Sequence, residues 1–346
     1  MSLYIYTIDR SEEWDRVVRS FSSYDVYYLS GYVRAFEFHG DGQPLLFYYV
    51  GENIKGINVV MKRDIADDDF FADKINSGEL FDFITPYGYG GWLIEGTADS
   101  GELFSEYEKW CKDHNIVSEF VRYHPMLGNA REAKEFYEVV PLGNTISMDL
   151  TSPEVIWENI TSKNRNMIRK AQRSSVVIHR GQFPEIYKTF KEIYDLTMDS
   201  DNAKAYYYFK DEFYNSVLND LSDEAQVFFA EFEGKVIAAA IMISSNGYMN
   251  YHLSGSLREY QHLAPTNLLL YKAACWGSRN GCKTLHLGGG VGSREDGLYK
   301  FKRAFNRKET KRFEIGKKVY LNDIYEHLAK MKKVDLEEQF FPVYRA

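Results

Sequence analysis

The residues of this chain that could do chemistry near neutral pH are mainly cations, and two groups of them stand in its second half. The block LYKFKRAF at 298–305 predicts a short helix, because its three apolar positions, the first, fourth and last, fall on one face at a spacing of three to four. Lys300, Lys302 and Arg303 then point away from that face and form a basic surface. An unperturbed lysine has a pKa of about 10.4, so such cations suit stabilisation of phosphate or oxyanion charge better than proton abstraction. A plain solvated surface is the competing interpretation.

The second basic group lies between residues 163 and 173, where five cations occur without an acidic residue. Arg165, Arg169 and Arg173 recur at four-residue steps, which places three guanidinium groups on one side of a predicted helix. Such a stripe suits a bidentate grip on phosphates, as in a pyrophosphate or a nucleic-acid backbone. A solvated helix face that exchanges ion pairs with the acidic first half explains the pattern equally well.

The glycines Gly288, Gly289 and Gly290 begin the loop GGGVG, which follows a predicted strand and precedes a predicted helix. The loop does not satisfy GxGxxG, which needs glycine where Ser293 stands, and no GK[ST] occurs for a P-loop. Small residues would let backbone amides approach an anionic ligand near a helix N-terminus. A purely structural tight turn accounts for them as well.

Aromatic residues supply the other candidate contacts. PYGYGG presents Tyr87 and Tyr89 on a backbone that its glycines make flexible, and aromatic faces with hydroxyl donors suit a sugar or peptide acceptor. Asp82, just upstream, is a candidate general base, although an isolated Asp in a strand is more often structural. Tyr251 and His252, in YHLSG, are candidate contacts to a substrate, and packing within a strand is the alternative.

Several other classes of function lack support. No Gly-x-Ser-x-Gly or Cys–His signature occurs and the eight histidines include no HExxH, so neither hydrolysis nor metal catalysis is indicated and no metal ligand is assigned. Three cysteines without CxxC spacing predict neither a disulfide framework nor a zinc site. The start MSLYIYTIDR has no leader pattern and no run of about 18 apolar residues occurs, so we expect a cytoplasmic protein without a transmembrane segment.

Length and charge predict two lobes of different character. A chain of 346 residues is long for one compact domain. The net charge is −8, but residues 1–150 carry −13 and residues 151–346 carry +5, so the second half is the better partner for an anion. We place the boundary near 150, because TSPEVIWENI offers Thr151 or Ser152 as an N-cap with Pro153 in the first turn.

The elements that must position these residues follow from hydrophobic periodicity and turn residues. Helices are predicted near 14–21 and over 101–114, from 151, over 162–173, 183–198, 210–221, 265–279 and 298–305, and from 322. Strands are predicted over 45–51, 54–62, 81–87, 117–123, 225–233, 235–244, 247–254, 284–287 and 312–320. Each half therefore runs from helices through antiparallel strands to a late helix and strand, which indicates two related α+β lobes.

Six segments in register resemble the FemXAB (FemAB-like) peptidyltransferase family of the GNAT acyltransferase superfamily. Those of the second half are SKNRNMIRKAQR, YHLSG and the stretch APTNLLLYKAACWGSRNGCKTLHLGGGVGSREDGLYKFKRAFN. Those of the first half are DVYYLSGYVRAF, ITPYGYGG and VRYHPMLGN. The resemblance spans nearly the whole chain.

This resemblance implies an α+β (α/β) fold of two tandem GNAT-like lobes with mixed, mainly antiparallel sheets and a cleft between them. Residues 1–150 would form the acceptor-side lobe and residues 151–346 the donor-side lobe. The family ties activity to the pair that stands here as Phe301 and Lys302, so these become the first catalytic candidates, followed by Asp82. The helical arm that some members insert has no counterpart, since no long heptad stretch occurs after residue 150.

The leading hypothesis is an aminoacyltransferase of peptidoglycan biosynthesis that takes an amino acid from aminoacyl-tRNA and adds it to an amine of a nucleotide- or lipid-linked cell-wall precursor. No cofactor is expected beyond the donor itself. Acyl-CoA is the alternative donor, but the stretch from Arg258 to Pro265 lacks the glycines with which standard GNAT loops hold a pyrophosphate. A third hypothesis is a non-catalytic module that binds nucleic acid or polysaccharide.

Overall fold

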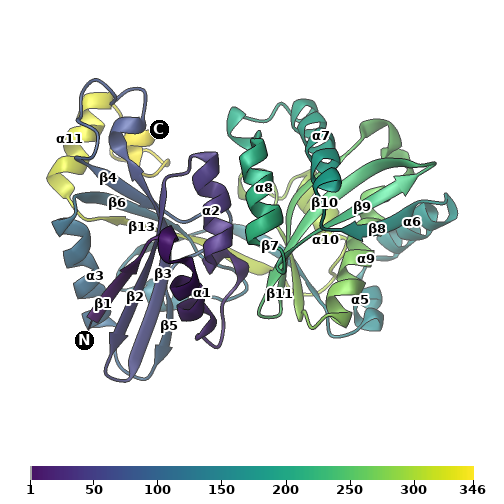
Figure 1. The fold of residues 1–346 in the computed structure, drawn as a ribbon, viewed down its shortest axis with the longest axis horizontal. Helices are drawn as coiled ribbons and strands as arrows, with labels where there is room; N and C mark the ends of the chain where they lie inside the picture. Colours follow the sequence, from purple (N-terminus) through teal and green to yellow (C-terminus); the bar gives the residue numbers. More distant parts are fainter. Residues whose placement is uncertain (1) are drawn as a thin grey trace. The chain divides into compact units, whose positions relative to one another are not determined.

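The chain divides into two compact units in a computed structural model that describes residues 2–346. The first unit comprises the residues up to Leu142 together with Phe313–Ala346, and the second comprises Gly143–Arg312. Each unit carries a mixed, mainly antiparallel sheet with helices against it, the predicted fold class (Figure 1).

The elements of the first unit are β1 (Ser2–Tyr6), α1 (Ser11–Arg19), α2 (Ser30–His39), β2 (Gln43–Gly51), β3 (Ile54–Asp64), β4 (Phe81–Ile84), β5 (Leu93–Gly96), α3 (Gly101–Asp113), β6 (Ile116–Arg122), α4 (Ala130–Ala133), β13 (Lys311–Val319) and α11 (Asn322–Lys332). Those of the second unit are β7 (Glu138–Asp149), α5 (Pro153–Asn159), α6 (Ser162–Arg173), β8 (Val177–Gly181), α7 (Pro184–Ser200), α8 (Asp211–Asp220), β9 (Ala225–Phe232), β10 (Lys235–Ser245), β11 (Tyr248–Ser256), α9 (Pro265–Arg279), β12 (Thr284–Gly288) and α10 (Gly297–Arg303). Strands β7 and β13 each begin in one unit and end in the other.

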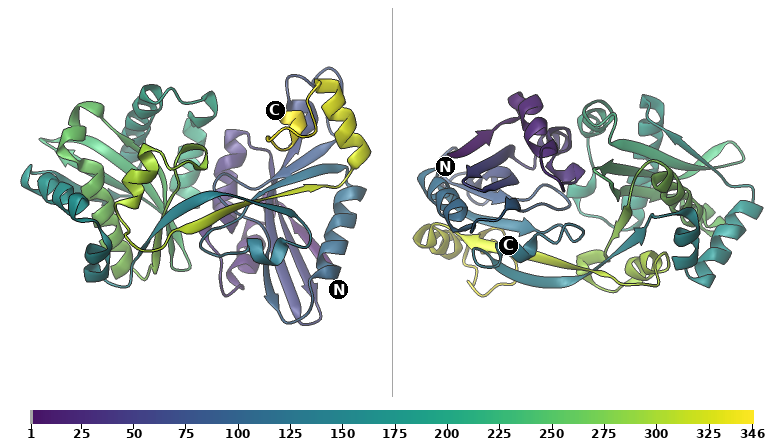
Figure 2. Two further views of the ribbon diagram at one scale, coloured as in Figure 1. Left: turned by 180° about the vertical axis from the view of Figure 1, so that it is seen from behind. Right: turned by 90° about the horizontal axis from the view of Figure 1, so that it is seen from below.

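The observed units differ from the expected division at residue 150 at both ends of the second lobe. The residues of β7 after 145 pair with β12, so they belong to the second unit. The chain then returns, because β13 pairs with β6 and α11 packs on β6 within the first unit (Figure 2). These are non-local pairings, and local sequence signals such as a helix cap carry no information about them.

The sheet of the first unit has the order β1-β2-β3-β4-β6-β13, with β5 pairing β3 as well. Only β4 and β6 run parallel within it. Buried tyrosines form part of its core. Their hydroxyls donate hydrogen bonds to the buried carboxylate of Glu119, from Tyr137 at 2.9 Å, Tyr107 at 3.1 Å, and Tyr320. Burial raises the pKa of Glu119, and these hydrogen bonds counteract part of that rise.

The sheet of the second unit has the order β7-β12-β11-β10-β9-β8, and only β11 and β12 run parallel. Alternate residues of β10, Ala238, Ala240 and Met242, join α9 in one hydrophobic core. The opposite face meets α7, since a Cβ on Gly255 would contact the backbone of Ile193 (Figure 1). The sheet is therefore covered on both faces, with α9 on one and α7 on the other.

The predicted helices 162–173 and 265–279 are confirmed to the residue. Their ends carry strong local signals: the side chain of Thr161 caps α6 by accepting a hydrogen bond from the Asn164 amide, and Pro265 opens α9. Strand β4 is shorter than predicted, since it ends at Ile84 rather than at residue 87. Within residues 2–346, none of the helices has the length and apolar character needed to cross a membrane.

Candidate functional site

The ladder between β11 and β12 is short and stops before either strand ends. It joins 248–250 to 284–286, ending at the pair Asn250 and His286. Strand β11 continues to Ser256, paired with β10. A parallel pair that stops midway leaves part of the β11 edge outside the sheet of this unit, and such an edge is a template for an extended chain.

A β-bulge lies in β11 just past this point. The partners of Ile241 and Met242 are Leu253 and Tyr251, so His252 is the extra residue. Burial lowers the pKa of His252 to about 3, which keeps the ring neutral near physiological pH. Bulges re-aim side chains and are common beside active sites.

Tyr251, the other candidate substrate contact, packs against the α9-side core of the second unit. Its hydroxyl donates a hydrogen bond to Ser254 Oγ at 2.6 Å, and burial raises its pKa to about 12. These contacts favour the packing alternative for Tyr251.

Lys302 is buried on α10, with a side chain that is 9% exposed. Its Nζ donates a hydrogen bond to the carbonyl oxygen of Gly289 at 2.8 Å, directly after the end of β12. Burial lowers the pKa of Lys302 to about 8, and the charge of Asp296 counteracts part of that fall. The structure thus brings Lys302 together with the glycine loop, at the end of β12.

The predicted orientation of α10 was wrong at its two most important positions. Leu298, expected on the buried face, is 42% exposed, whereas Tyr299 and Lys302 are buried and Phe301 packs partly against the core. The helix begins at Gly297 because Asp296 caps it. Tyr299 and Lys302 are three residues apart and therefore share the buried face of the helix.

Asp296 fixes the glycine loop to the start of α10. Its Oδ1 accepts a hydrogen bond from the Tyr299 amide at 2.9 Å, and its Oδ2 accepts one from the Val291 amide at 3.0 Å. These bonds lower the pKa of Asp296, so it is charged near neutral pH. A Cβ on Gly290 would overlap the carbonyl oxygen of Arg294.

The predicted amide-lined anion site at Gly288–Gly290 takes a different form. The carboxylate of Asp296 already occupies the amides at the start of α10, and the loop turns a carbonyl, that of Gly289, toward Lys302. Gly288 has a φ of 77°, a conformation that favours glycine. The loop therefore positions a cation, and the tight-turn alternative explains its glycines.

Two of the three arginines predicted to contact phosphate, Arg165 and Arg169, lie over the ring of Trp157. Arg165 donates from Nη1 to the Trp157 carbonyl at 3.2 Å and is half-buried, while exposed Arg169 places its guanidinium 5.1 Å from the Trp157 ring centroid. Arg169, Trp157 and Tyr271 line a groove of about 360 Å³ on the surface of the second unit. Arg165 is thus held by its own unit, and Arg169 stays accessible to a ligand.

Tyr87 and Tyr89 lie in the loop between β4 and β5 of the first unit. Tyr87 stacks on Phe36 with ring centroids 5.3 Å apart, and Tyr89 packs edge-on against Tyr27 and Phe313. Both rings are half-buried, so each keeps part of its surface open.

The backbone of this loop is held firmly, contrary to the flexibility expected from its glycines. Arg122 donates to the carbonyl oxygens of Thr85 (2.9 Å), Pro86 (2.9 Å) and Gly88 (3.2 Å), and Asn129 donates to that of Gly90 (2.9 Å). The glycines serve close packing instead: a Cβ on Gly88 would collide with the ring of Tyr27. Tyr87 and Tyr89 are therefore presented on a rigid backbone.

Asp82 has the geometry of a structural ion pair rather than of a general base. It is fully buried, and its Oδ1 accepts a hydrogen bond from Arg63 Nε at 2.7 Å. Its Oδ2 accepts from Arg345 Nε at 2.6 Å and from the Tyr344 hydroxyl at 3.2 Å. Both oxygens are engaged in an ion-pair network and the side chain is fully buried, so the carboxylate is not accessible to an attacking amine.

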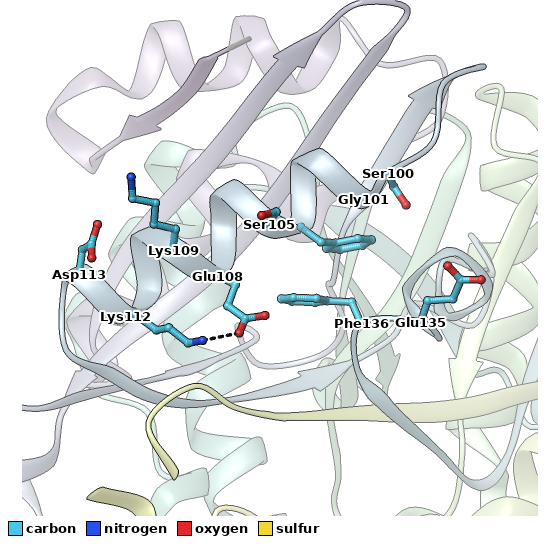
Figure 3. A pocket seen from close by; sticks show the side chains of 10 residues that line it. Ser100, Gly101, Ser105, Glu108, Lys109, Lys112, Asp113, Glu135 and Phe136 are labelled. Atoms are coloured by element: carbon cyan, nitrogen blue, oxygen red, sulfur yellow. Dashed lines mark ion pairs between the residues drawn. The ribbon is translucent and has the colours of Figure 1, made fainter. Parts of the chain in front are cut away.

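A larger groove in the first unit, about 620 Å³, contains none of the predicted site residues among its described lining (Figure 3). Phe104 of α3 stacks on Phe136 with centroids 4.6 Å apart, and Glu108 pairs with Lys112 beside them. Its lining is mainly charged surface around one aromatic stack.

Comparison with known proteins agrees with this architecture. Residues 160–303 match the family model described as the acetyltransferase (GNAT) domain. Across the whole chain, FemX superposes with a TM-score of 0.69 at 13% identity, covering 94% of this chain and 99% of FemX. The chain therefore shares the fold of FemX, and its residues 160–303 match the GNAT domain model.

Two further structures share the FemX-like fold at low identity. The C-terminal domain of a putative lysylphosphatidylglycerol synthetase from Agrobacterium fabrum has a TM-score of 0.57 at 13% identity, covering 93% of this chain and 96% of that one. L-PGS from Bacillus licheniformis has a TM-score of 0.56 at 15% identity, covering 88% and 90%. No curated protein sequence matches the chain significantly.

Sequence reasoning missed three residues that position the candidate side chains within their own units. Asp296 had a usable signal, since an Asp three residues before Tyr299 at the start of a helix is a typical N-cap. Trp157 and Arg122 had no local signal, because their partners are Arg169 on another helix and the carbonyls of a distant loop.

Proposed function

We propose that this protein is an aminoacyltransferase that moves an aminoacyl group from aminoacyl-tRNA to an amine of a peptidoglycan precursor or a related cell-envelope acceptor. The observation that carries the proposal is the buried ammonium of Lys302, held by the Gly289 carbonyl directly after β12. It supplies a positioned cation where the β11–β12 ladder stops, and the β11 edge beyond that ladder suits an extended donor.

The reaction needs only a neutral amine, a positioned ester and charge stabilisation. The amine nitrogen attacks the ester carbonyl, and a C–N bond forms as the C–O bond to the tRNA ribose breaks. The proton lost by the nitrogen goes to the departing ribose oxygen. Lys302 in its protonated form stabilises the oxyanion of the tetrahedral intermediate, and no covalent enzyme intermediate is required.

Contacts in each unit support separate roles for the two substrates. In the second unit, exposed Arg169 beside Trp157 offers a guanidinium and an aromatic face, which suit phosphate and base of a nucleic acid. In the first unit, the half-buried rings of Tyr87 and Tyr89 on a rigid loop suit a sugar or peptide acceptor. A tRNA donor places the reaction in the cytoplasm.

Acyl-CoA is a second candidate donor, because the β11 edge beyond its ladder with β12 also suits a linear carrier arm. The segment before α9 argues against it: residues Arg258–Leu263 form a 3-10 helix, and Ala264 has a φ of 57°. Amides already inside a helical turn have fewer free donors for a pyrophosphate.

The test is to incubate the purified protein with labelled aminoacyl-tRNAs and, separately, with labelled acyl-CoAs, each with a nucleotide-linked peptide acceptor. Amide product from aminoacyl-tRNA alone supports the proposal, and product from acyl-CoA alone replaces it by the second candidate. Binding of tRNA or polysaccharide without product from either donor would identify a non-catalytic module.

A further inference from the structure

A groove of about 610 Å³ runs between α7 and α8 of the second unit, and the acyl-transfer proposal makes no use of it. Its size is that of a small-molecule site. Four acidic residues and two lysines line it, so its lining is net negative although the second half of the sequence is net positive. The acidic residues are Glu185, Glu192, Asp195 and Asp211.

The lysines neutralise only part of this charge. Lys191 pairs with Asp211 at 2.5 Å, and Lys188 extends from α7 as an exposed side chain. The pKa of Asp195 is raised: burial is the largest cause, the charge of Lys191 opposes it, and the charges of Asp199 and Asp211 add to it. The groove therefore has an excess of negative potential centred near Asp195.

Two polar atoms of the groove residues have no protein partner among residues 2–346: Asp195 Oδ1 and the hydroxyl oxygen of Tyr214. Tyr214 is 4% exposed, and rings of Phe190 and Phe213 pack against it at centroid distances of 5.9 and 5.3 Å. Those contacts hold the Tyr214 ring in place. Burial is the largest cause of the raised pKa of Tyr214, and the charges of Asp195 and Asp211 raise it further. A buried polar atom without a hydrogen-bond partner costs free energy. A ligand that donates a hydrogen bond to such an atom removes that cost, which favours its binding.

The chemistry of these groups selects the ligand class. A metal ion is not indicated, because within the described chain no group of three or more His, Cys, Asp or Glu side chains could hold one. An ammonium group has three donors and one positive charge, which match a carboxylate oxygen and a phenolic oxygen. Leu218 and the ring of Tyr187, further along the groove, suit an alkyl chain.

We propose that the α7–α8 groove binds a primary alkylammonium group, carried by a free diamine or by a lysine side chain, with Asp195 and Tyr214 as its polar contacts. This site is independent of the proposed acyl transfer. A protein without transfer activity would bind the amine as well, so failure of one proposal does not decide the other.

The test measures binding by calorimetry at pH 7 with three probes of similar length. Cadaverine represents a free diamine, Nα-acetyl-lysinamide represents a lysine side chain, and pentane-1,5-diol is the uncharged control. Binding of either amine without binding of the diol supports the proposal, and the amine that binds more tightly identifies the source. Equal binding of the diol, or no binding of either amine at millimolar concentration, would overturn it.

Three variants separate a specific site from general attraction. Asp195→Asn should weaken amine binding by about tenfold or more, since a charge-assisted hydrogen bond is lost. Tyr214→Phe should also weaken binding while leaving the unliganded protein as stable as before or more so, because it removes a buried hydroxyl without a partner. Glu212→Gln removes the same charge from an exposed position of α8 outside the groove and should leave binding nearly unchanged. Equal loss in Asp195→Asn and Glu212→Gln would contradict the site.

Discussion

Lys302 Nζ donates a hydrogen bond to the carbonyl oxygen of Gly289 at 2.8 Å, and this bond joins the one buried cation of α10 to the end of β12. A buried ammonium is costly unless it has partners, yet here the protein supplies one carbonyl and one nearby carboxylate, Asp296. Donor capacity on the ammonium is left over for a further acceptor. The pKa of about 8 places its titration within the range where enzymes are assayed.

If Lys302 acts as a cation, the rate of acyl transfer should fall as pH rises through about 8, because the ammonium is then lost. Lys302→Arg should move this descending limb to higher pH, since a guanidinium stays protonated. Lys302→Met should lower kcat by about a hundredfold, the typical cost of losing one oxyanion donor. A descending limb that does not move in Lys302→Arg would contradict the assignment.

The same titration predicts the effect of Lys302 on stability. Its pKa is lower in the folded protein than the usual 10.5, so burial of the ammonium costs free energy below pH 8, and the cost is relieved as pH rises from about 8 toward 10.5. Lys302→Met should therefore leave the free energy of unfolding unchanged or higher at pH 7, with a smaller difference at pH 9.5. Chemical denaturation at both pH values measures this and shows that the variant is folded.

Asp296→Asn tests whether the helix cap also sets the charge state of Lys302. Asparagine retains capping ability, so α10 should persist. The negative charge that raises the pKa of Lys302 is lost, so the descending limb of the pH–rate profile should move to lower pH. A profile that coincides with that of the wild type would show that Asp296 serves the fold alone.

Gly290→Ala should disrupt the loop that holds the Gly289 carbonyl. Its φ of −88° suits any residue, so the obstacle is steric: the new Cβ would overlap the Arg294 carbonyl. Overpacking against backbone costs about 1–3 kcal/mol, and we expect transfer activity to fall at least tenfold. Gly297→Ala is the matched control, since nothing lies within 4 Å of a Cβ there, and it should keep activity.

Asp82→Asn separates a structural carboxylate from a catalytic one. The substitution leaves Arg63 and Arg345 without their buried partner, so the free energy of unfolding should fall by about 3 kcal/mol or more, as measured by denaturation. At a temperature where the variant stays folded, kcat should be close to that of the wild type. A large loss of kcat with unchanged stability would restore the general-base hypothesis.

Local signals predicted the elements that carry the candidate site better than they predicted its contacts. Helices α6 and α9 start at Ser162 and Pro265 as expected, because caps and proline act on neighbouring residues. The pairing of Asp82 with Arg345 was not predictable in this way, since 263 residues separate the two in sequence. The same holds for β13, whose partner β6 lies far upstream.

Periodicity failed for α10 because the helix has only seven residues. Over so short a length, a shift of one residue in its start rotates the inward face, and the Asp296 cap decides that start. The family resemblance singled out Lys302, while the periodicity expected it on an exposed face, whereas it is buried.

The most direct test of the central claim compares the wild type with folded Lys302→Met in a single assay. Labelled aminoacyl-tRNA and a nucleotide-linked peptide acceptor are mixed with each protein at pH 7.5, and the initial rate of labelled amide formation is measured. We expect product from the wild type and a rate about a hundredfold lower from the variant. Equal rates from the two proteins would contradict the role of the buried ammonium.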